Sequence, residues 1–216
     1  MQNSTQKLAV IALTCTVFGL SVFTFSNAKT ATVTAQDDAN RGVVAERVGQ
    51  WVSVACELRP GPQHLIRDIT ITETDWTAII NTFADPSCNE PALTLTITGP
   101  VIFGELHPMA EGAVESDFVI QTLSVMPQNL FVVDFLNTAE ASTCGSETWQ
   151  VGVEQDVTET GCGLLGFAEL PLTDHDVTFV RDNYLFAGAR PLEGGGFEEP
   201  EDRPTAVQVP LVRADN

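Results

Sequence analysis

The sequence has little positive charge. It carries 10 Lys and Arg against 29 Asp and Glu, for a net charge of −19, and only Lys7 and Lys29 are lysines. Nucleic acids and anionic lipid headgroups are bound through Lys and Arg that neutralise phosphate, so this composition argues against both as partners. We interpret the acidic charge as a solvated surface suited to salt rather than as a recognition patch.

The sequence also lacks the common signatures of catalysis and metal binding. There is no Gly-x-Ser-x-Gly nucleophile elbow and no glycine-rich phosphate loop. No two cysteines have Cys-x-x-Cys spacing, and His64, His107 and His175 are scattered, so we predict neither a metal nor another cofactor. These absences favour a protein that is not an enzyme.

Three polar groups could still carry chemistry. Asp174-His175-Asp176 could ligate a metal or serve as a base, but such residues are ordinary in the turn that we expect there. The acidic segment 193–202 could bind Ca²⁺, but it lacks regular ligand spacing, and we interpret it as a solvated loop. Glu57, Arg59 and Arg67 could bind an anion, although a structural ion pair at a strand end is the simpler interpretation.

A targeting segment occupies the N-terminus. Residues 8–25 are apolar, Lys7 precedes them, and Ser26-Asn27-Ala28 offers the small residues that a signal peptidase reads. We predict a signal peptide over residues 1–28, cleaved after Ala28, and a secreted or periplasmic protein; an uncleaved membrane anchor is the alternative. Cleavage removes Lys7 and no acid, which leaves 9 bases against 29 acids, or −20. Residues 29–46 have no usable periodicity and are predicted to be a flexible leader.

Four cysteines follow the signal peptide: Cys56, Cys88, Cys144 and Cys162. An even number in an exported protein predicts two disulfides. Four cysteines allow three pairings, and the sequence does not choose among them. We favour the sequential pairing, Cys56–Cys88 and Cys144–Cys162, because each pair flanks a turn-rich segment.

Short alternating segments separated by turn residues fill the rest of the chain. In residues 93–98 three apolar side chains share one face and three threonines the other, and Gly99-Pro100 then breaks the strand. Residues 118–125 and 130–136 have hairpin-like spacing. Further strands are predicted over residues 51–56, 65–72, 76–83, 149–154, 167–172, 177–180, 184–186 and 205–212. No segment shows a helical stripe. We therefore predict an all-β domain over residues 47–213, an antiparallel meander forming a curved, closed or half-open β-barrel with two disulfides.

Apolar side chains fall on both faces of several predicted strands, as at Phe118-Val119-Ile120. A sheet with one solvated face does not need this pattern, whereas a curved sheet around an apolar cavity does. A densely packed sandwich is the alternative. The residues predicted to line the cavity, each of which could instead belong to a dry core, are Leu93, Leu95, Ile97, Ile69, Ile71, Phe118, Ile120, Phe131, Val133 and Phe179.

Residues 49–67 carry a resemblance to a known family. Gly49-Gln50-Trp51-Val52-Ser53, then Cys56-Glu57-Leu58-Arg59-Pro60-Gly61-Pro62, then Arg67, resembles the opening of the adenomatosis polyposis coli down-regulated domain family. That family has Gly-x-Trp-x-Ser followed by Cys-Glu-x-Arg-Pro-Gly and a downstream Arg. Cys88, followed by Pro91, falls where the family has its second Cys. The resemblance is specific in this opening and looser over the remainder of residues 48–190.

The resemblance implies a fold and a ligand. Animal members are secreted or membrane-tethered inhibitors of Wnt signalling, and their domain is a curved, partly open antiparallel β-barrel with an apolar cavity for a lipid chain. The motif residues would be structural, with Trp51 as a core anchor, Cys56 and Cys88 as a staple and Arg59-Pro60-Gly61 as a turn. Animal members carry two such domains and a membrane anchor, whereas this sequence has one domain and a bacterial-looking signal peptide. We therefore expect it to share the cavity rather than the Wnt partner.

These observations predict an exported, non-enzymatic protein that binds a lipid, a fatty acyl chain or another apolar small molecule. One alternative is an envelope or secreted protein–protein interaction module with a filled core, whose partner is another envelope protein. A second alternative is a hydrolase that uses the acids near His175. Membrane contact is expected only through an uncleaved N-terminus.

Overall fold

A computed structural model describes residues 42–59, 63–138, 144–145, 148–190 and 198–214. The predicted signal peptide with its cleavage site, residues 29–41 of the predicted leader, and Pro60 lie outside these ranges. None of the helices in the described ranges is long and apolar enough to cross a membrane.

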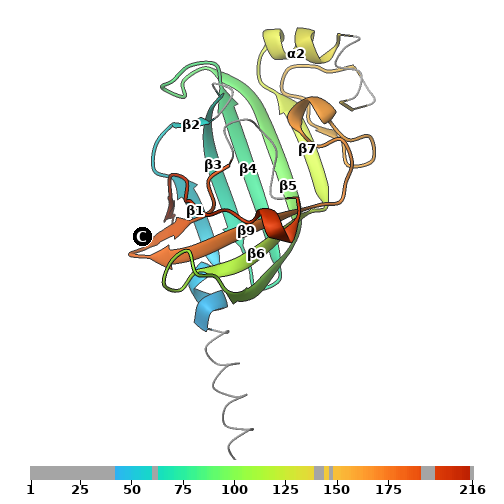
Figure 1. Ribbon diagram of the computed structural model, residues 1–216. Helices are drawn as coiled ribbons and strands as arrows, with labels where there is room; N and C mark the ends of the chain where they lie inside the picture. The colour runs from blue at the N-terminus through green and yellow to red at the C-terminus, as the bar shows by residue number, and fades with distance from the viewer. Residues whose placement is uncertain (1–41, 60–62, 139–143, 146–147, 191–197, 215–216) are drawn as a thin grey trace, which may run out of the picture. The chain divides into compact units, whose positions relative to one another are not determined.

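Strands dominate the described residues (Figure 1). In chain order they are β1 (Gly49–Ser53), β2 (Glu57–Arg59), β3 (Gln63–Ile71), β4 (Asp75–Phe83), β5 (Pro91–Leu106), β6 (Val114–Ile120), β7 (Thr122–Pro127), β8 (Gln155–Asp156), β9 (Leu172–Arg181), β10 (Tyr184–Phe186) and β11 (Leu211–Arg213). The two-residue period is clearest in β6, where buried and half-buried side chains alternate along the whole strand. One helix, α2 (Leu130–Leu136), and two 3₁₀ turns, η2 (Gly163–Leu165) and η3 (Pro200–Asp202), interrupt the series.

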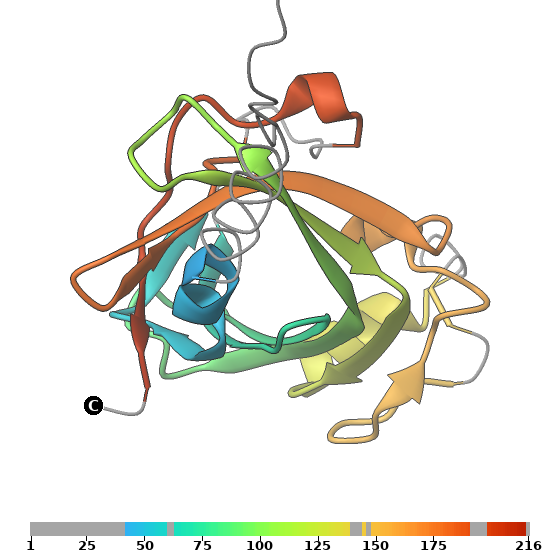
Figure 2. The same ribbon diagram turned by 90° about the horizontal axis from the view of Figure 1, so that it is seen from below.

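Eight of these strands close into an antiparallel barrel, which confirms the predicted fold class. The ring runs β1–β3–β4–β5–β6–β9–β10–β11 and returns to β1, where Trp51 lies opposite Arg213 and Ser53 opposite Leu211. Neighbours in the ring are mostly neighbours in the sequence, as in a meander, and the view from below shows the ring closed (Figure 2). The remaining strands extend the sheet: β2 continues the edge that β1 forms against β3, and β7 and β8 extend the edge beside β5.

The longest strand, β5, passes through Gly99-Pro100 without interruption, so the predicted break there is wrong. Residues 91–100 of β5 pair with β4, and residues 101–106 pair with β6. A Cβ atom on Gly99 would collide with the backbone oxygen of Val119, which follows from the close crossing of β5 and β6. The glycine therefore permits a close approach of two strands rather than ending one of them.

The segment predicted as a strand over residues 130–136 is instead the helix α2. Asn129 caps it: the backbone is extended at Asn129, and its side-chain oxygen accepts a hydrogen bond from the Val132 amide at 2.9 Å. Val133 and Leu136 face the core, whereas Leu130 and Phe131 are exposed. The cap and the two buried positions three residues apart favour a helical turn over a hairpin strand.

Three further strand predictions are wrong or too long. Residues 149–154 form a turn, because the Trp149 amide and carbonyl bond to the side chain of Asn137 rather than to a neighbouring strand. Residues 167–171 are irregular. Of residues 205–212, only the last two belong to a strand, β11, although an isolated bridge joins Val207 to Gly188.

Both disulfides form with the favoured pairing, Cys56–Cys88 and Cys144–Cys162, with S–S distances of 2.08 and 2.04 Å. The first joins the link between β1 and β2 to the loop between β4 and β5. The second lies in the insertion between β7 and β9 that also contains α2, β8 and η2. Each disulfide therefore fastens a segment that the barrel ladder itself does not hold.

A short helix over residues 42–47 closes the lower end of the barrel (Figures 1 and 2). It begins inside the segment predicted as leader. Its last residue, Arg47, has no exposed surface and donates hydrogen bonds to the carbonyl oxygens of Val43, Gly112 and Thr178 and to the Thr178 hydroxyl. Trp51 in turn donates its indole N–H to the Arg47 carbonyl at 2.7 Å. No sequence pattern predicted that this helix and Arg47 would close the lower end of the barrel.

Candidate functional site

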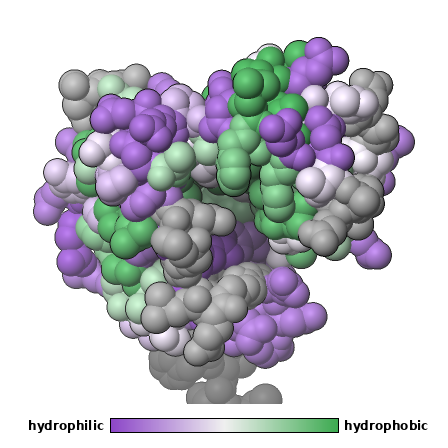
Figure 3. Space-filling view, turned by 90° about the horizontal axis from the view of Figure 1, so that it is seen from above, coloured by the Kyte–Doolittle hydropathy of each residue, from purple (hydrophilic) through white to green (hydrophobic). Residues whose placement is uncertain are grey.

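A pocket of about 520 Å³ occupies the interior of the barrel. Its walls come from alternate residues of β3, β4, β5, β6, β9, β10 and β11, because side chains at every second position of a strand point to the same face. The apolar part includes Ile69, Ile71, Ala78, Ile97, Phe118 and Ile120. Seen from above, the molecule is hollowed near its centre, with hydrophilic residues in the hollow and hydrophobic residues on parts of its rim (Figure 3).

Five of the ten residues predicted as cavity lining do line this pocket: Ile69, Ile71, Ile97, Phe118 and Ile120. They come from β3, β5 and β6, three strands whose alternation is strong in the sequence. Trp76, on β4, packs edge-on against Phe118 with 5.0 Å between ring centroids, and its indole N–H reaches the Val119 carbonyl. Phe118 was among the predicted lining residues, whereas Trp76 and Ala78 were not.

The structure places the other five predicted residues elsewhere. Leu93 and Leu95 are buried where β5 pairs with β7, beyond the pocket. Phe131 and Val133 belong to α2, and the side chain of Phe131 is 82% exposed. Phe179 lies on the outer face of β9, where it stacks on Phe186 with 4.6 Å between centroids.

The floor of the pocket is sealed by polar groups that satisfy one another. Thr178, on β9, lines the pocket and accepts a hydrogen bond from Nε of Arg47 at 2.9 Å. Its hydroxyl also bonds the Ser116 hydroxyl at 2.7 Å. All three side chains are fully buried. The polar side chains described at the lower end of the pocket are therefore paired with one another rather than available to a ligand.

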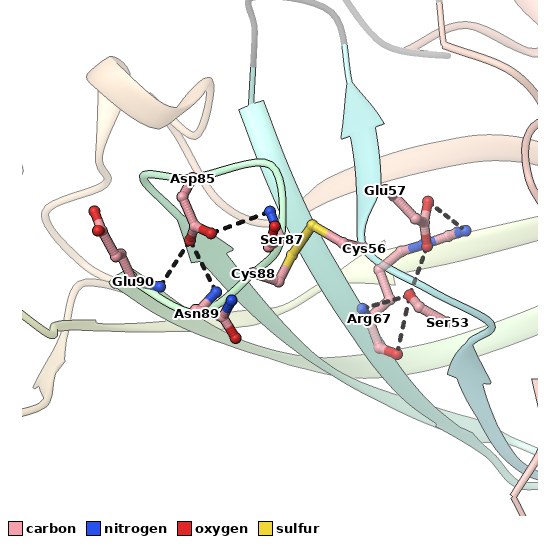
Figure 4. Close-up of a disulfide and its surroundings, with 9 residues drawn as sticks. All are labelled: Ser53, Cys56, Glu57, Arg67, Asp85, Ser87, Cys88, Asn89 and Glu90. Atoms are coloured by element: carbon pink, nitrogen blue, oxygen red, sulfur yellow. Dashed lines mark hydrogen bonds and ion pairs between the residues drawn. A yellow bond between two sulfur atoms is a disulfide. The ribbon is translucent and has the colours of Figure 1, made fainter.

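One wall of the pocket carries a buried ion pair between Glu57 of β2 and Arg67 of β3 (Figure 4). Arg67 donates to the two Glu57 carboxylate oxygens at 2.9 and 3.0 Å and to the Val209 carbonyl at 2.9 Å. Ser53 donates to Glu57 and accepts from the Arg67 amide. Both carboxylate oxygens of Glu57 therefore accept hydrogen bonds from Arg67, and the pair fixes β2 to β3 next to the Cys56–Cys88 disulfide.

Arg59, also on β2, lines the same wall but lacks such a partner. Its Nε is 3.5 Å from a Glu57 carboxylate oxygen that already bonds Arg67, and it makes no hydrogen bond to the described residues. Its side chain is 17% exposed. Burial, and then the neighbouring charge of Arg67, lower the pKa of Arg59 to about 10. Arg59 is therefore still a cation at neutral pH.

The opposite wall carries acids. Arg190 donates to both carboxylate oxygens of Asp174, once at 2.6 Å from Nη1 and once from Nη2. Asp176 is buried and accepts hydrogen bonds from the amides of Val177 and Gly188 at 2.6 and 2.7 Å. Burial, helped by the charge of Asp174, raises the pKa of Asp176 to about 6. The pocket thus combines apolar walls with a small set of ionisable groups.

The motif Asp174-His175-Asp176 lies within β9 and not in the predicted turn. Strand alternation separates its members: Asp174 and Asp176 line the pocket, whereas His175 pairs with Asp117 at 2.8 Å. Asp117 also accepts a hydrogen bond from Arg203 at 2.7 Å. The three residues of the motif therefore do not converge on one site, as a hydrolase would require.

A family model described as adenomatosis polyposis coli down-regulated 1 matches residues 27–182 of the chain, more than two thirds of its length. The matched range includes all four disulfide cysteines, Trp51, and the pocket walls from β3 to β9. Strands β10 and β11, which complete the ring, lie beyond it. The match is to a family that is not known for enzymatic activity.

Proposed function

The chain belongs to the adenomatosis polyposis coli down-regulated 1 family, and we propose that it is an exported, non-enzymatic binding protein whose pocket holds a lipid or fatty acyl chain. The observation that supports this proposal is the pocket itself, which is lined by strands of the barrel and is mainly apolar. A ligand of matching shape would be apolar over most of its length and would enter from the upper end.

The size of the pocket supports an acyl chain. At about 30 Å³ for a water-sized group, a volume of about 520 Å³ corresponds to on the order of 15 methylene-sized groups. Each buried methylene contributes about 0.8 kcal/mol, less the cost of ordering the chain. The volume also lies in the ordinary range for small-molecule sites.

The disulfides support an exported protein. Disulfides form and persist in oxidising compartments and are rare in the cytosol, so the two in this chain indicate an extracellular or periplasmic setting. A secreted or periplasmic location would bring the pocket into contact with envelope lipids or with lipids in the surroundings.

The first experiment is native mass spectrometry of the protein purified from an oxidising compartment, followed by solvent extraction and uptake of a fluorescent acyl probe. We expect an extractable fatty acid or phospholipid, or saturable uptake of the probe. Ala78→Phe fills the pocket from β4 and should abolish uptake, whereas Ile79→Phe adds the same ring to the exposed next position and should not. A wild-type protein that carries no lipid and takes up no probe would overturn the proposal.

An envelope interaction module is the alternative function, and the surface of α2 favours it. Leu130, Phe131 and Phe135 are all exposed on this short helix. Such a module would bind a protein through this surface and would be indifferent to Ala78→Phe. The effect of Ala78→Phe, compared with that of Ile79→Phe, therefore distinguishes a lipid-binding protein from a protein-interaction module.

A further inference from the structure

We infer that Arg59 binds the carboxylate of the pocket's ligand, so that the preferred occupant is a free fatty acid rather than a neutral lipid. The inference rests on the proposed function and adds the chemistry of the ligand's polar end. It follows from a comparison of the three arginines that line the pocket.

Two of these arginines already hold a carboxylate. Arg67 binds both oxygens of Glu57, and Arg190 binds both oxygens of Asp174. A guanidinium has five N–H donors in a planar fork that fits a carboxylate, and both pairs use this geometry. Arg59 is the pocket arginine whose Nε has no hydrogen-bond partner among the described residues. It has the donors for a third such pair.

Arg59 is mostly buried, which makes the lack of a hydrogen-bond partner for its Nε among the described residues significant. Most of its side chain is withdrawn from water, so the charge has lost hydration, and its Nε has gained no hydrogen bond from the described residues. Burial is also the largest cause of the lowered pKa of Arg59, which is consistent with a charge that is partly withdrawn from water. A carboxylate in the pocket would restore the interactions that Arg59 has lost, and its chain would extend along the apolar walls.

The other charged groups of the pocket do not already serve as that partner. Glu57 and Asp174 are held by Arg67 and Arg190, and Glu198 is exposed. Asp176 attracts Arg59 across the pocket, but the two do not approach to ion-pair distance, and the Asp176 carboxylate is held by backbone amides. Because the pKa of Asp176 is about 6, part of its opposing negative charge is already lost in mildly acidic solution.

The test compares palmitic acid with palmityl alcohol and methyl palmitate, three ligands that share a chain and differ at the polar end. Each displaces a bound fluorescent acyl probe from wild type, Arg59→Met, Arg59→Lys and Arg181→Met. Arg181 is exposed at the end of β9, so Arg181→Met removes the same charge away from the pocket. Thermal unfolding confirms that each variant is folded.

We expect wild type and Arg181→Met to prefer the acid over the alcohol about tenfold or more, as a charge-assisted hydrogen bond provides. Arg59→Met should bind all three with similar affinity, and Arg59→Lys should keep part of the preference because it keeps the charge without the fork. Equal binding of the three ligands by wild type, or an acid preference that survives in Arg59→Met, would overturn the inference but leave lipid binding intact. If wild type binds none of them, the proposed function itself fails. Should Arg59→Met not fold, the wild-type ratio alone decides.

Discussion

Arg47, which is fully buried, and Arg59, which is mostly buried, lie in different parts of the barrel and differ in their hydrogen bonds. Burial is the largest cause that lowers the pKa of both Arg47 and Arg59 to about 10, and for Arg59 the neighbouring charge of Arg67 adds to it. Arg47, at the lower end of the barrel, compensates for its lost hydration through hydrogen bonds to three carbonyl oxygens and one hydroxyl. The Nε of Arg59, in the pocket wall, has no hydrogen-bond partner in the part of the chain that the structure describes.

The comparison separates a structural role from a binding role. A buried cation whose donors all meet fixed acceptors holds the fold together, and removing it leaves those acceptors unsatisfied. A buried cation with free donors in a pocket stabilises the fold little, but it is ready to recognise a ligand. The hydrogen bonds of Arg47 therefore stabilise the lower end of the barrel, whereas the binding role of Arg59 is the part of this comparison that we propose.

The largest effect is expected from the disulfide that anchors β2. In the chain-entropy account, removal of Cys56–Cys88, which spans 32 positions, costs about 4 kcal/mol. The double variant Cys56→Ala/Cys88→Ala should also weaken the acid preference, because β2 carries Arg59. The double variant Cys144→Ala/Cys162→Ala is the control: it should lose about 3 kcal/mol and keep the preference. Urea unfolding and probe displacement measure the two quantities, and loss of preference in both variants would contradict this assignment.

A smaller effect distinguishes the two arginines directly. Arg47→Met should lower the free energy of unfolding by about 3 kcal/mol, because it leaves buried carbonyls without donors. Arg59→Met should change it by no more than about 0.5 kcal/mol, since few fixed contacts are lost. Both are read from urea unfolding followed by circular dichroism. Similar losses in the two variants would show that Arg59 is as structural as Arg47.

The smallest effect concerns Asp176 and pH. Its pKa is about 6 in the folded protein and near the ordinary 3.8 when unfolded, so the folded state binds this proton more tightly. The carboxyl therefore makes stability fall as pH rises from about 4 to 7, by on the order of 2–3 kcal/mol. Asp176→Asn should remove that part of the pH dependence. The free energy of unfolding at pH 4.5 and pH 7.5 gives the difference between the two proteins, and equal differences would refute the assignment.

Much of the barrel could be predicted from local patterns. Strands β3, β4, β5 and β6 alternate clearly, and half of the predicted lining residues come from them and do line the pocket. Residues 130–136 could not be assigned by periodicity alone, because a short apolar run fits a strand or a buried helix equally well. Asn129, a good N-cap residue directly before that run, was the available signal for α2.

The polar part of the site could not be predicted, because it is assembled by distant segments. Arg190 follows β10 and meets Asp174 on β9, and both line the same pocket as Arg59 of β2 only because the sheet closes on itself. Arg47 was missed for the same reason: it meets Thr178, 131 positions away. These side-chain contacts join segments that are far apart in the sequence, and they form only when the ring of strands closes.

The pairing of β1 with β11 also bears on when the protein folds. Arg213 donates to the carbonyl of Val48, 165 positions earlier in the chain, so the ring cannot close until the segment up to Arg213 has left the ribosome. Contacts of such long range form slowly, because the entropy of closing the loop is lost before the contact is gained. A chain that closes its barrel last stays unfolded longest. For the exported protein that we propose, this delay would favour passage through a secretion channel in an extended form, followed by closure and disulfide formation on the far side.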